Sequence, residues 1–173
     1  MATDSKKFDG LNEERLLKFK ERILWHQNNG GFSNDLKPLA DHVNFKYLPQ
    51  PIVKFYKIIG FGEIGSPSDY LIYDITKPSF IADDDEGTFF VYAPDEPNTE
   101  QIYTLEYDFK GEVKVKDIIF LGRSVDGENM GIVKNSNKDI VTTIWGNGGT
   151  DMLSYIEEIF LNFEKYEGIK CPL

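Results

Sequence analysis

The chain has 173 residues, of which 40% are hydrophobic and 14% aromatic, and its formal net charge is −10. This length fits one domain with a sizeable core, and this composition excludes an intrinsically disordered chain. The single cysteine, Cys171, excludes an intramolecular disulfide and any zinc site built on several cysteines.

The first ten residues are polar and are expected to be frayed. From Leu11 to about His26, apolar residues recur at helical spacing and predict an amphipathic helix. The turn-forming residues from Asn28 to Gly31 predict its end. The apolar stripe of this helix consists of Leu16, Phe19 and Ile23, widened by Leu24.

Residues 32–48 contain Pro38 and scattered apolar residues, and we expect a loop with one short helical turn. The segment from Ile52 to Ile59 predicts a second helix, because Pro51 suits a first turn and Gly60 suits a helix end. Its content of isoleucine and aromatic residues also fits a buried strand, which is the alternative.

The second half of the chain favours strands. Segments rich in Ile, Val, Phe and Tyr are separated by short segments that contain Gly, Asp, Asn and Pro. Connections this short favour antiparallel pairing of neighbouring strands. The expected strands are Tyr70–Thr76, Thr88–Tyr92, Gln101–Phe109, Val113–Gly122, Gly131–Lys134 and Ile140–Ile144.

A last helix is expected after Thr150 or Asp151, either of which can cap it. Its apolar face consists of Met152, Leu153, Ile156, Ile159, Phe160 and Phe163. The element order predicts an α+β fold, in which N-terminal helices and a C-terminal helix pack on a twisted antiparallel sheet. No linker or repeat interrupts residues 1–173, so we expect a single domain.

The acidic charge is concentrated in the middle of the chain. Residues 58–108 contain twelve Asp and Glu against one basic residue, Lys77, whereas residues 1–57 carry a small positive excess. Such a surface repels phosphate groups and attracts basic proteins, so we expect a protein partner and no nucleic acid. The alternative is that an acidic surface simply keeps the protein in solution.

The acidic run Asp83, Asp84, Asp85 and Glu86, together with Asp95 and Glu96, is the predicted contact patch for a basic partner. A solvated loop is the alternative. A calcium-binding EF-hand is excluded because Pro94 stands where that loop needs its last glutamate. We therefore expect no metal and no cofactor.

Other candidate motifs are weaker. Gly60 to Gly65 has the form G-x-G-x-x-G, but Pro67 would interrupt the helix that a dinucleotide site needs, so we interpret it as a turn from helix to sheet. The two histidines, His26 and His42, are expected at the surface or at its boundary. No stretch is apolar enough to span a membrane and the N-terminus is no secretory signal, so we expect a cytoplasmic protein.

Three features together resemble the SUKH superfamily, the Smi/Knr-type domains. The first is Leu48-Pro49, followed by Phe55-Tyr56 and the glycine-rich turn from Gly60 to Gly65. The second is Ile118–Gly122, followed by Asp126-Gly127 and by Gly131–Val133. The third is Ile140–Trp145, which precedes a final helix. The resemblance covers about residues 45–165. The segment 78–100, with its prolines and acidic run, is longer than the family pattern.

The resemblance implies an α+β domain without enzymatic activity. Many bacterial members are immunity proteins that bind and neutralise a toxin, and fungal members are cytoplasmic scaffolds. Our leading hypothesis is an immunity protein for a basic toxin domain, and the alternative is a scaffold or regulatory domain without a toxin. A third hypothesis is an enzyme that uses carboxylates such as Glu63 or Asp74.

Overall fold

The computed structural model describes residues 13–30, 33–65, 72–82, 91–93, 102–105, 111–114, 117–124, 129–134, 140–143 and 150–173. The α-helices in this part are α2 (Glu13–Asn29), α3 (Gln50–Ile58) and α4 (Met152–Glu167), and η2 (Val43–Tyr47) is a 3-10 helix. The strands are β1 (Ser33–Asn34), β2 (Gly62–Gly65), β3 (Ile72–Ala82), β4 (Val91–Ala93), β5 (Ile102–Leu105), β6 (Gly111–Lys114), β7 (Ile118–Ser124), β8 (Asn129–Val133), β9 (Ile140–Thr143) and β10 (Thr150–Asp151).

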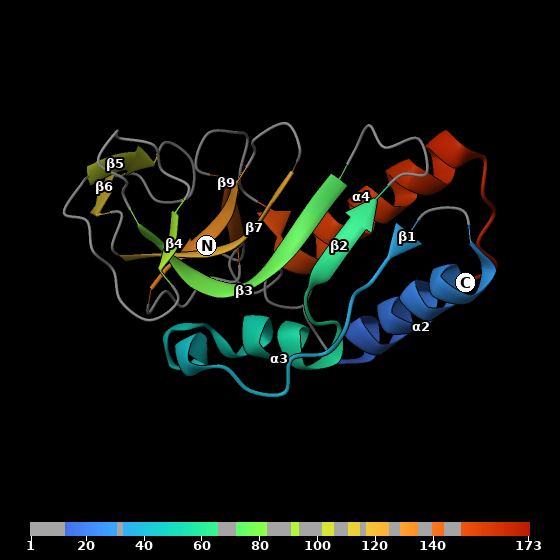
Figure 1. Ribbon diagram of the computed structural model, residues 1–173, viewed down its shortest axis with the longest axis horizontal. Helices are drawn as coiled ribbons and strands as arrows, with labels where there is room; N and C mark the ends of the chain where they lie inside the picture. The colour runs from blue at the N-terminus through green and yellow to red at the C-terminus, as the bar shows by residue number, and fades with distance from the viewer. Residues whose placement is uncertain are drawn as a thin grey trace, which may run out of the picture.

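The strands form one large antiparallel sheet in the order β1-β2-β3-β7-β8-β9-β10, with β4 paired to β3. Strands β5 and β6 form a separate two-stranded sheet. The long strand β3 is the centre of the large sheet, because it pairs with β2, β4 and β7. This arrangement confirms the predicted α+β fold with an antiparallel sheet (Figure 1).

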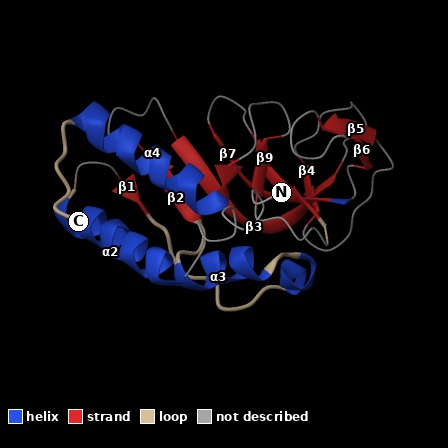
Figure 2. Cartoon of the chain, turned by 180° about the vertical axis from the view of Figure 1, so that it is seen from behind, coloured by secondary structure: helices blue, strands red, loops and turns tan. Residues whose placement is uncertain are grey.

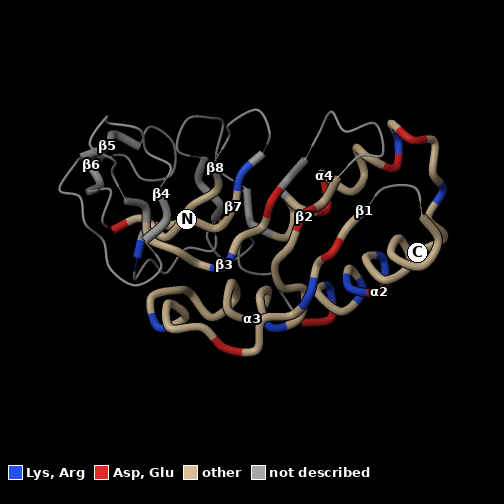
Figure 3. Tube along the Cα trace, viewed as in Figure 1, with Lys and Arg blue, Asp and Glu red and all other residues tan. Residues whose placement is uncertain are grey.

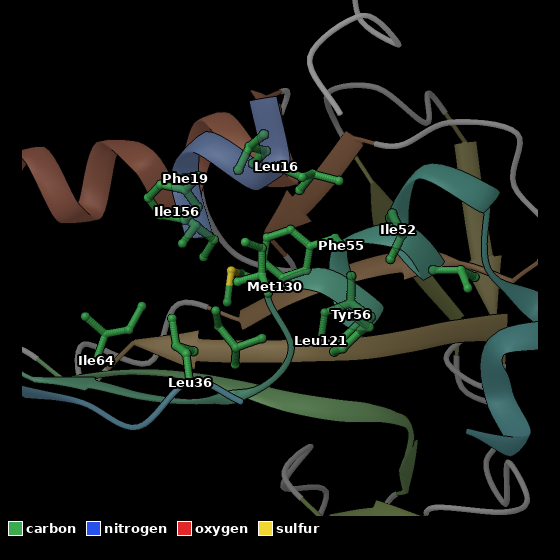
Figure 4. Packing of buried hydrophobic residues seen from close by; sticks show 14 of the residues in the cluster. Leu16, Phe19, Leu36, Ile52, Phe55, Tyr56, Ile64, Leu121, Met130 and Ile156 are labelled. Atoms are coloured by element: carbon green, nitrogen blue, oxygen red, sulfur yellow. The ribbon is translucent and has the colours of Figure 1, made fainter. Parts of the chain in front are cut away.

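One face of the sheet carries the helices and the hydrophobic core. Helix α4 lies behind the strands in Figure 1 and in front of them in Figure 2, while α2 and α3 run along one side. Figure 4 shows core side chains from the three helices meeting those from the sheet. The side chains of Leu16, Ile52, Phe55, Tyr56, Ile64, Ile75, Ile119, Leu121, Leu153, Ile156 and Phe160 are completely buried.

Helix α3 confirms the predicted second helix over the alternative of a buried strand. Pro51 lies in its first turn, and the apolar side chains that could also have served a strand are buried on one side of the helix. Tyr56 is fully buried, and its hydroxyl donates a hydrogen bond to the Thr76 carbonyl at 2.9 Å. The bond ties α3 to the middle of β3. Burial raises the pKa of Tyr56 well above 10, so the hydroxyl keeps its proton and remains a donor.

The glycine-rich segment after α3 is only partly a turn, which corrects the interpretation from sequence. Gly60 has a φ of 97°, which favours glycine, and a Cβ here would stand 1.7 Å from the Lys37 carbonyl oxygen. From Gly62 the chain is already strand β2, which pairs with both β1 and β3. The close approach of the Gly60 backbone to the Lys37 backbone depends on the tertiary structure, so the motif alone does not reveal it.

The expected strand Val113–Gly122 is two strands, which is a second correction. Strand β6 pairs with β5 in the small sheet, whereas β7 pairs with β3 and β8 in the large one. Asp117 immediately precedes β7, and its carbonyl accepts a hydrogen bond from the Lys134 amide at 2.6 Å. Val113 and Val115 alternate with lysines as in a strand, and only Lys116 and Asp117 separate them from the apolar run of residues 118–121, so the pattern of side chains does not show the break.

Candidate functional site

Three carboxylates gather on the sheet face opposite the core. Glu63 on β2 and Asp74 on β3 are direct cross-strand partners, and their neighbours Ile64 and Ile75 are buried on the core side. Since successive side chains of a strand point to opposite faces, both acids belong to the other face. Asp35 follows β1, and its Oδ1 accepts a hydrogen bond from the Glu63 amide at 2.5 Å. We call these three residues the acidic row.

The acidic row has one basic neighbour in the register of the sheet. Arg123 on β7 lies opposite Asp74, so an arginine and a glutamate flank this aspartate on adjacent strands. Partial burial raises the pKa of Asp74, and the nearby charges of Glu63 and Asp35 raise it further, against the opposing effect of Arg123. The raised pKa means that burial and the neighbouring acids outweigh the arginine at this position.

The acidic row brings together two residues that the sequence suggested as candidates. Glu63 and Asp74 were candidates for a carboxylate enzyme, and the structure makes them neighbours. The predicted contact patch, Asp83 to Glu86 with Asp95 and Glu96, lies outside the described residues. Strand β3, which carries Asp74, ends at Ala82 immediately before this patch. Acidic and basic positions of the described chain can be followed along the trace in Figure 3.

A second polar group is buried between α2 and α4. Glu164 accepts hydrogen bonds from Arg22 Nε at 2.6 Å and from Arg22 Nη2, and its Oε1 lies 2.7 Å from His26 Nε2. The His26 residue is 1% exposed and Glu164 is 6% exposed. His26 therefore does not lie at the surface, which corrects the expectation from sequence. His42, by contrast, is half-buried, and its Nδ1 accepts a hydrogen bond from the Asn44 amide at the start of η2.

The parallel packing of two helices creates this buried group. Arg15 pairs with Glu157, and Arg22 pairs with Glu164, so each helix contributes residues seven positions apart. Seven residues are close to two helical turns, so both salt bridges lie along the same interface between α2 and α4. Phe19 lies between the two arginines and packs edge-on against Phe160 at 5.0 Å between ring centroids.

The turn after α4 brings the end of the chain back to the same place. Gly168 has a φ of 67°, its amide bonds to the Lys165 carbonyl, and the Ile169 amide bonds to the Glu164 carbonyl at 2.8 Å. This pair of bonds is a Schellman motif, which reverses the chain at a helix end. As a result Cys171 reaches His26 and Glu164, with ligand atoms within 4.8 Å of one another. Arg22 Nη1 also donates to the Leu173 carbonyl at 2.8 Å.

The hydrogen bonds decide the charge of Glu164. Burial alone would raise its pKa, but the hydrogen bonds from Arg22 and His26 and their positive charge outweigh burial, and the pKa lies below its usual value of 4.5. The guanidinium of Arg22 in turn has a raised pKa, mainly because it bonds to Glu164. The pair is therefore ionised at neutral pH.

A shallow hollow of about 270 Å³ opens beside this pair, between α2, α4 and the end of the chain. The acidic row does not contribute to it. Leu161 and Leu173 give it an apolar wall and are more than half exposed. The other lining residues are Lys18, Phe19, Glu21, Arg22 and Glu157.

Reasoning from sequence missed the group of Arg22, His26 and Glu164. A signal existed, because Glu164 stands next to Phe163 and four residues after Phe160, on the apolar face of its helix. An acid at such a position needs a cationic partner when it is buried. Which residue supplies the cation depends on the helix that packs there, and a helix pattern does not contain that information.

No helix in the described ranges has the length and apolar character required to span a membrane. No protein-family model matches this sequence, and neither a curated protein nor a solved structure is significantly similar to it.

Proposed function

We propose that this chain is a non-enzymatic protein-binding domain that binds a basic partner through its acidic side, in the manner of an immunity protein that neutralises a toxin. The supporting observation is the concentration of acidic residues in residues 58–108, which contain twelve Asp and Glu residues and only one basic residue, Lys77. In the described structure, two of these acids, Glu63 and Asp74, occupy adjacent positions on the sheet face opposite to that of Ile64 and Ile75.

The charges of the acidic row favour binding of a basic side chain from a partner protein. The pKa of Asp74 is raised partly because Glu63 and Asp35 repel its charge. A lysine or arginine from a partner would relieve this repulsion, and complementary charge speeds association and selects partners. The predicted contacts at Asp83 to Glu86, Asp95 and Glu96 belong to the same acidic stretch of the sequence and lie outside the described residues.

The proposal is tested by affinity capture with the tagged protein from a lysate of the source organism at low and high salt. Three baits are compared: the wild type, a variant with reversed charge at the six predicted contacts, and a control with reversed charge at Glu21 and Glu158. The two control residues are exposed on the helices, away from the acidic row. The retained proteins are identified by mass spectrometry.

We expect a basic protein that is retained by the wild type and the control, is lost from the six-residue variant, and elutes at high salt. The captured protein is then expressed alone and together with this chain. Growth arrest that co-expression relieves supports the immunity function, whereas a harmless signalling partner supports the scaffold alternative. A partner that binds the six-residue variant as tightly as the wild type contradicts the proposed surface.

A further inference from the structure

We propose that His26, Glu164 and Cys171 form a binding site for a divalent transition metal, with Zn²⁺ as the best match. This inference goes beyond the proposed partner binding and does not depend on it. The three side chains come from α2, from α4 and from the segment that follows the turn at Gly168. Their ligand atoms, one from each residue, all lie within 4.8 Å of one another.

The donor set points to the class of metal. Imidazole nitrogen, carboxylate oxygen and thiolate sulfur are the three ligand types that Zn²⁺ uses in proteins, and three protein ligands leave one tetrahedral position for water. Hard cations such as Mg²⁺ and Ca²⁺ prefer sites made of oxygen alone, so they are disfavoured here. Cys171 is partly exposed, which leaves a path for the metal from solvent.

The hydrogen bond between His26 and Glu164 shows how the metal would enter. Their Nε2 and Oε1 atoms are 2.7 Å apart and share a proton. If this nitrogen is the ligand, a metal takes the place of that proton and binds the same two lone pairs. Tetrahedral coordination at the usual Zn–N and Zn–O lengths requires roughly 3.3 Å between the two atoms, so the pair opens by less than an ångström.

Arg22 has a supporting role in this site and also limits its affinity. Its Nη2 donates to Oε2 of Glu164 and its Nε donates to Oε1 at 2.6 Å, so the guanidinium orients the carboxylate, as residues that support metal ligands commonly do. Its positive charge repels a cation, and the negative charges of the Cys171 thiolate and the Glu164 carboxylate offset that repulsion. Binding therefore requires the thiolate, which makes Cys171 the decisive ligand.

The test is a titration of the reduced full-length protein with Co²⁺, followed by absorption in the near ultraviolet, where a cobalt–thiolate bond gives a charge-transfer band. The cobalt is then displaced with Zn²⁺. Cys171→Ser removes the sulfur at a partly exposed position and leaves the buried hydrogen bonds intact. Glu158→Gln is the matched control, because it removes an exposed acid from the same helix.

We expect one equivalent of Co²⁺ to produce the thiolate band and Zn²⁺ to abolish it. Cys171→Ser should lose the band and weaken binding by at least about tenfold, the lower end of the loss seen even for supporting residues. Glu158→Gln should match the wild type. No thiolate band at saturating Co²⁺, or equal binding by Cys171→Ser and the wild type, overturns the proposal.

Discussion

Replacing Glu164 by glutamine is expected to destabilise the protein by about 3 kcal/mol at neutral pH, because it breaks a buried ion pair from one side. The change keeps the size of the side chain but removes its charge. It leaves the guanidinium of Arg22, whose side chain is only 21% exposed, without the carboxylate that now accepts two of its hydrogen bonds.

The size of the effect follows from the burial of the pair. Hydrogen bonds to a charged group contribute about 1.5–3 kcal/mol each, and the loss of one partner of a buried pair costs about 3–5 kcal/mol. We choose the lower end because Arg22 keeps its bond to the Leu173 carbonyl and reaches solvent in part. Near the melting temperature, about 3 kcal/mol corresponds to a decrease of roughly 6–12 °C for a domain of this size.

The second salt bridge between α2 and α4 supplies a matched control. Arg15 and Glu157 have the same spacing between α2 and α4, but both side chains are 30% exposed. Exposed pairs contribute about 1 kcal/mol or less. Urea unfolding of Glu164→Gln, Glu157→Gln and the wild type should therefore give a much larger loss for Glu164→Gln, with similar slopes for all three.

The pH dependence gives an independent measurement of the same interaction. The pKa of Glu164 is lowered in the folded state, so its ionised pair stabilises the protein above pH 4.5. This contribution is lost as the pH falls below 4.5 and through the folded-state pKa. The difference in stability between the wild type and Glu164→Gln should therefore shrink in acid. A variant within about 0.5 kcal/mol of the wild type at pH 7 would refute the reasoning.

Three further substitutions test other parts of the structure. The pKa of Asp74 is raised on folding, so its ionisation costs stability as the pH rises above 3.8; Asp74→Asn should raise the free energy of unfolding at pH 7 by up to about 1 kcal/mol, and a decrease in urea unfolding would contradict this. Gly60→Ala places a Cβ against the Lys37 carbonyl at a φ of 97° and should cost about 3 kcal/mol or more in thermal unfolding; a neutral result would exclude this close approach. Tyr56→Phe leaves the part-buried Thr76 carbonyl without this donor and should cost about 1 kcal/mol in urea unfolding; a variant as stable as the wild type would contradict a contribution from this bond.

Local patterns determined most of the elements of this fold. The stripe of Leu16, Phe19 and Ile23 is buried in α2, and the helix ends at Asn29, within the turn-forming segment that predicted its end. The α+β class followed from the order of helical and strand-like segments, because each type has its own spacing of apolar residues. The same information was insufficient at residues 113–122, where alternating Val and Lys residues lead into the apolar run of residues 118–121 and conceal a change from one sheet to another.

For the candidate sites too, some features followed from the sequence and others only from the tertiary structure. The sequence by itself determined that the middle of the chain is acidic and that Glu63 and Asp74 are available carboxylates. Only the tertiary structure decided that these two lie side by side, since their contact depends on the register of β2 against β3. It also decided that Arg22, His26, Glu164 and Cys171 meet, because helix packing and the turn at Gly168 join positions about 140 residues apart. Spacing along one helix or strand reports which face a side chain occupies, but not which distant segment will cover that face.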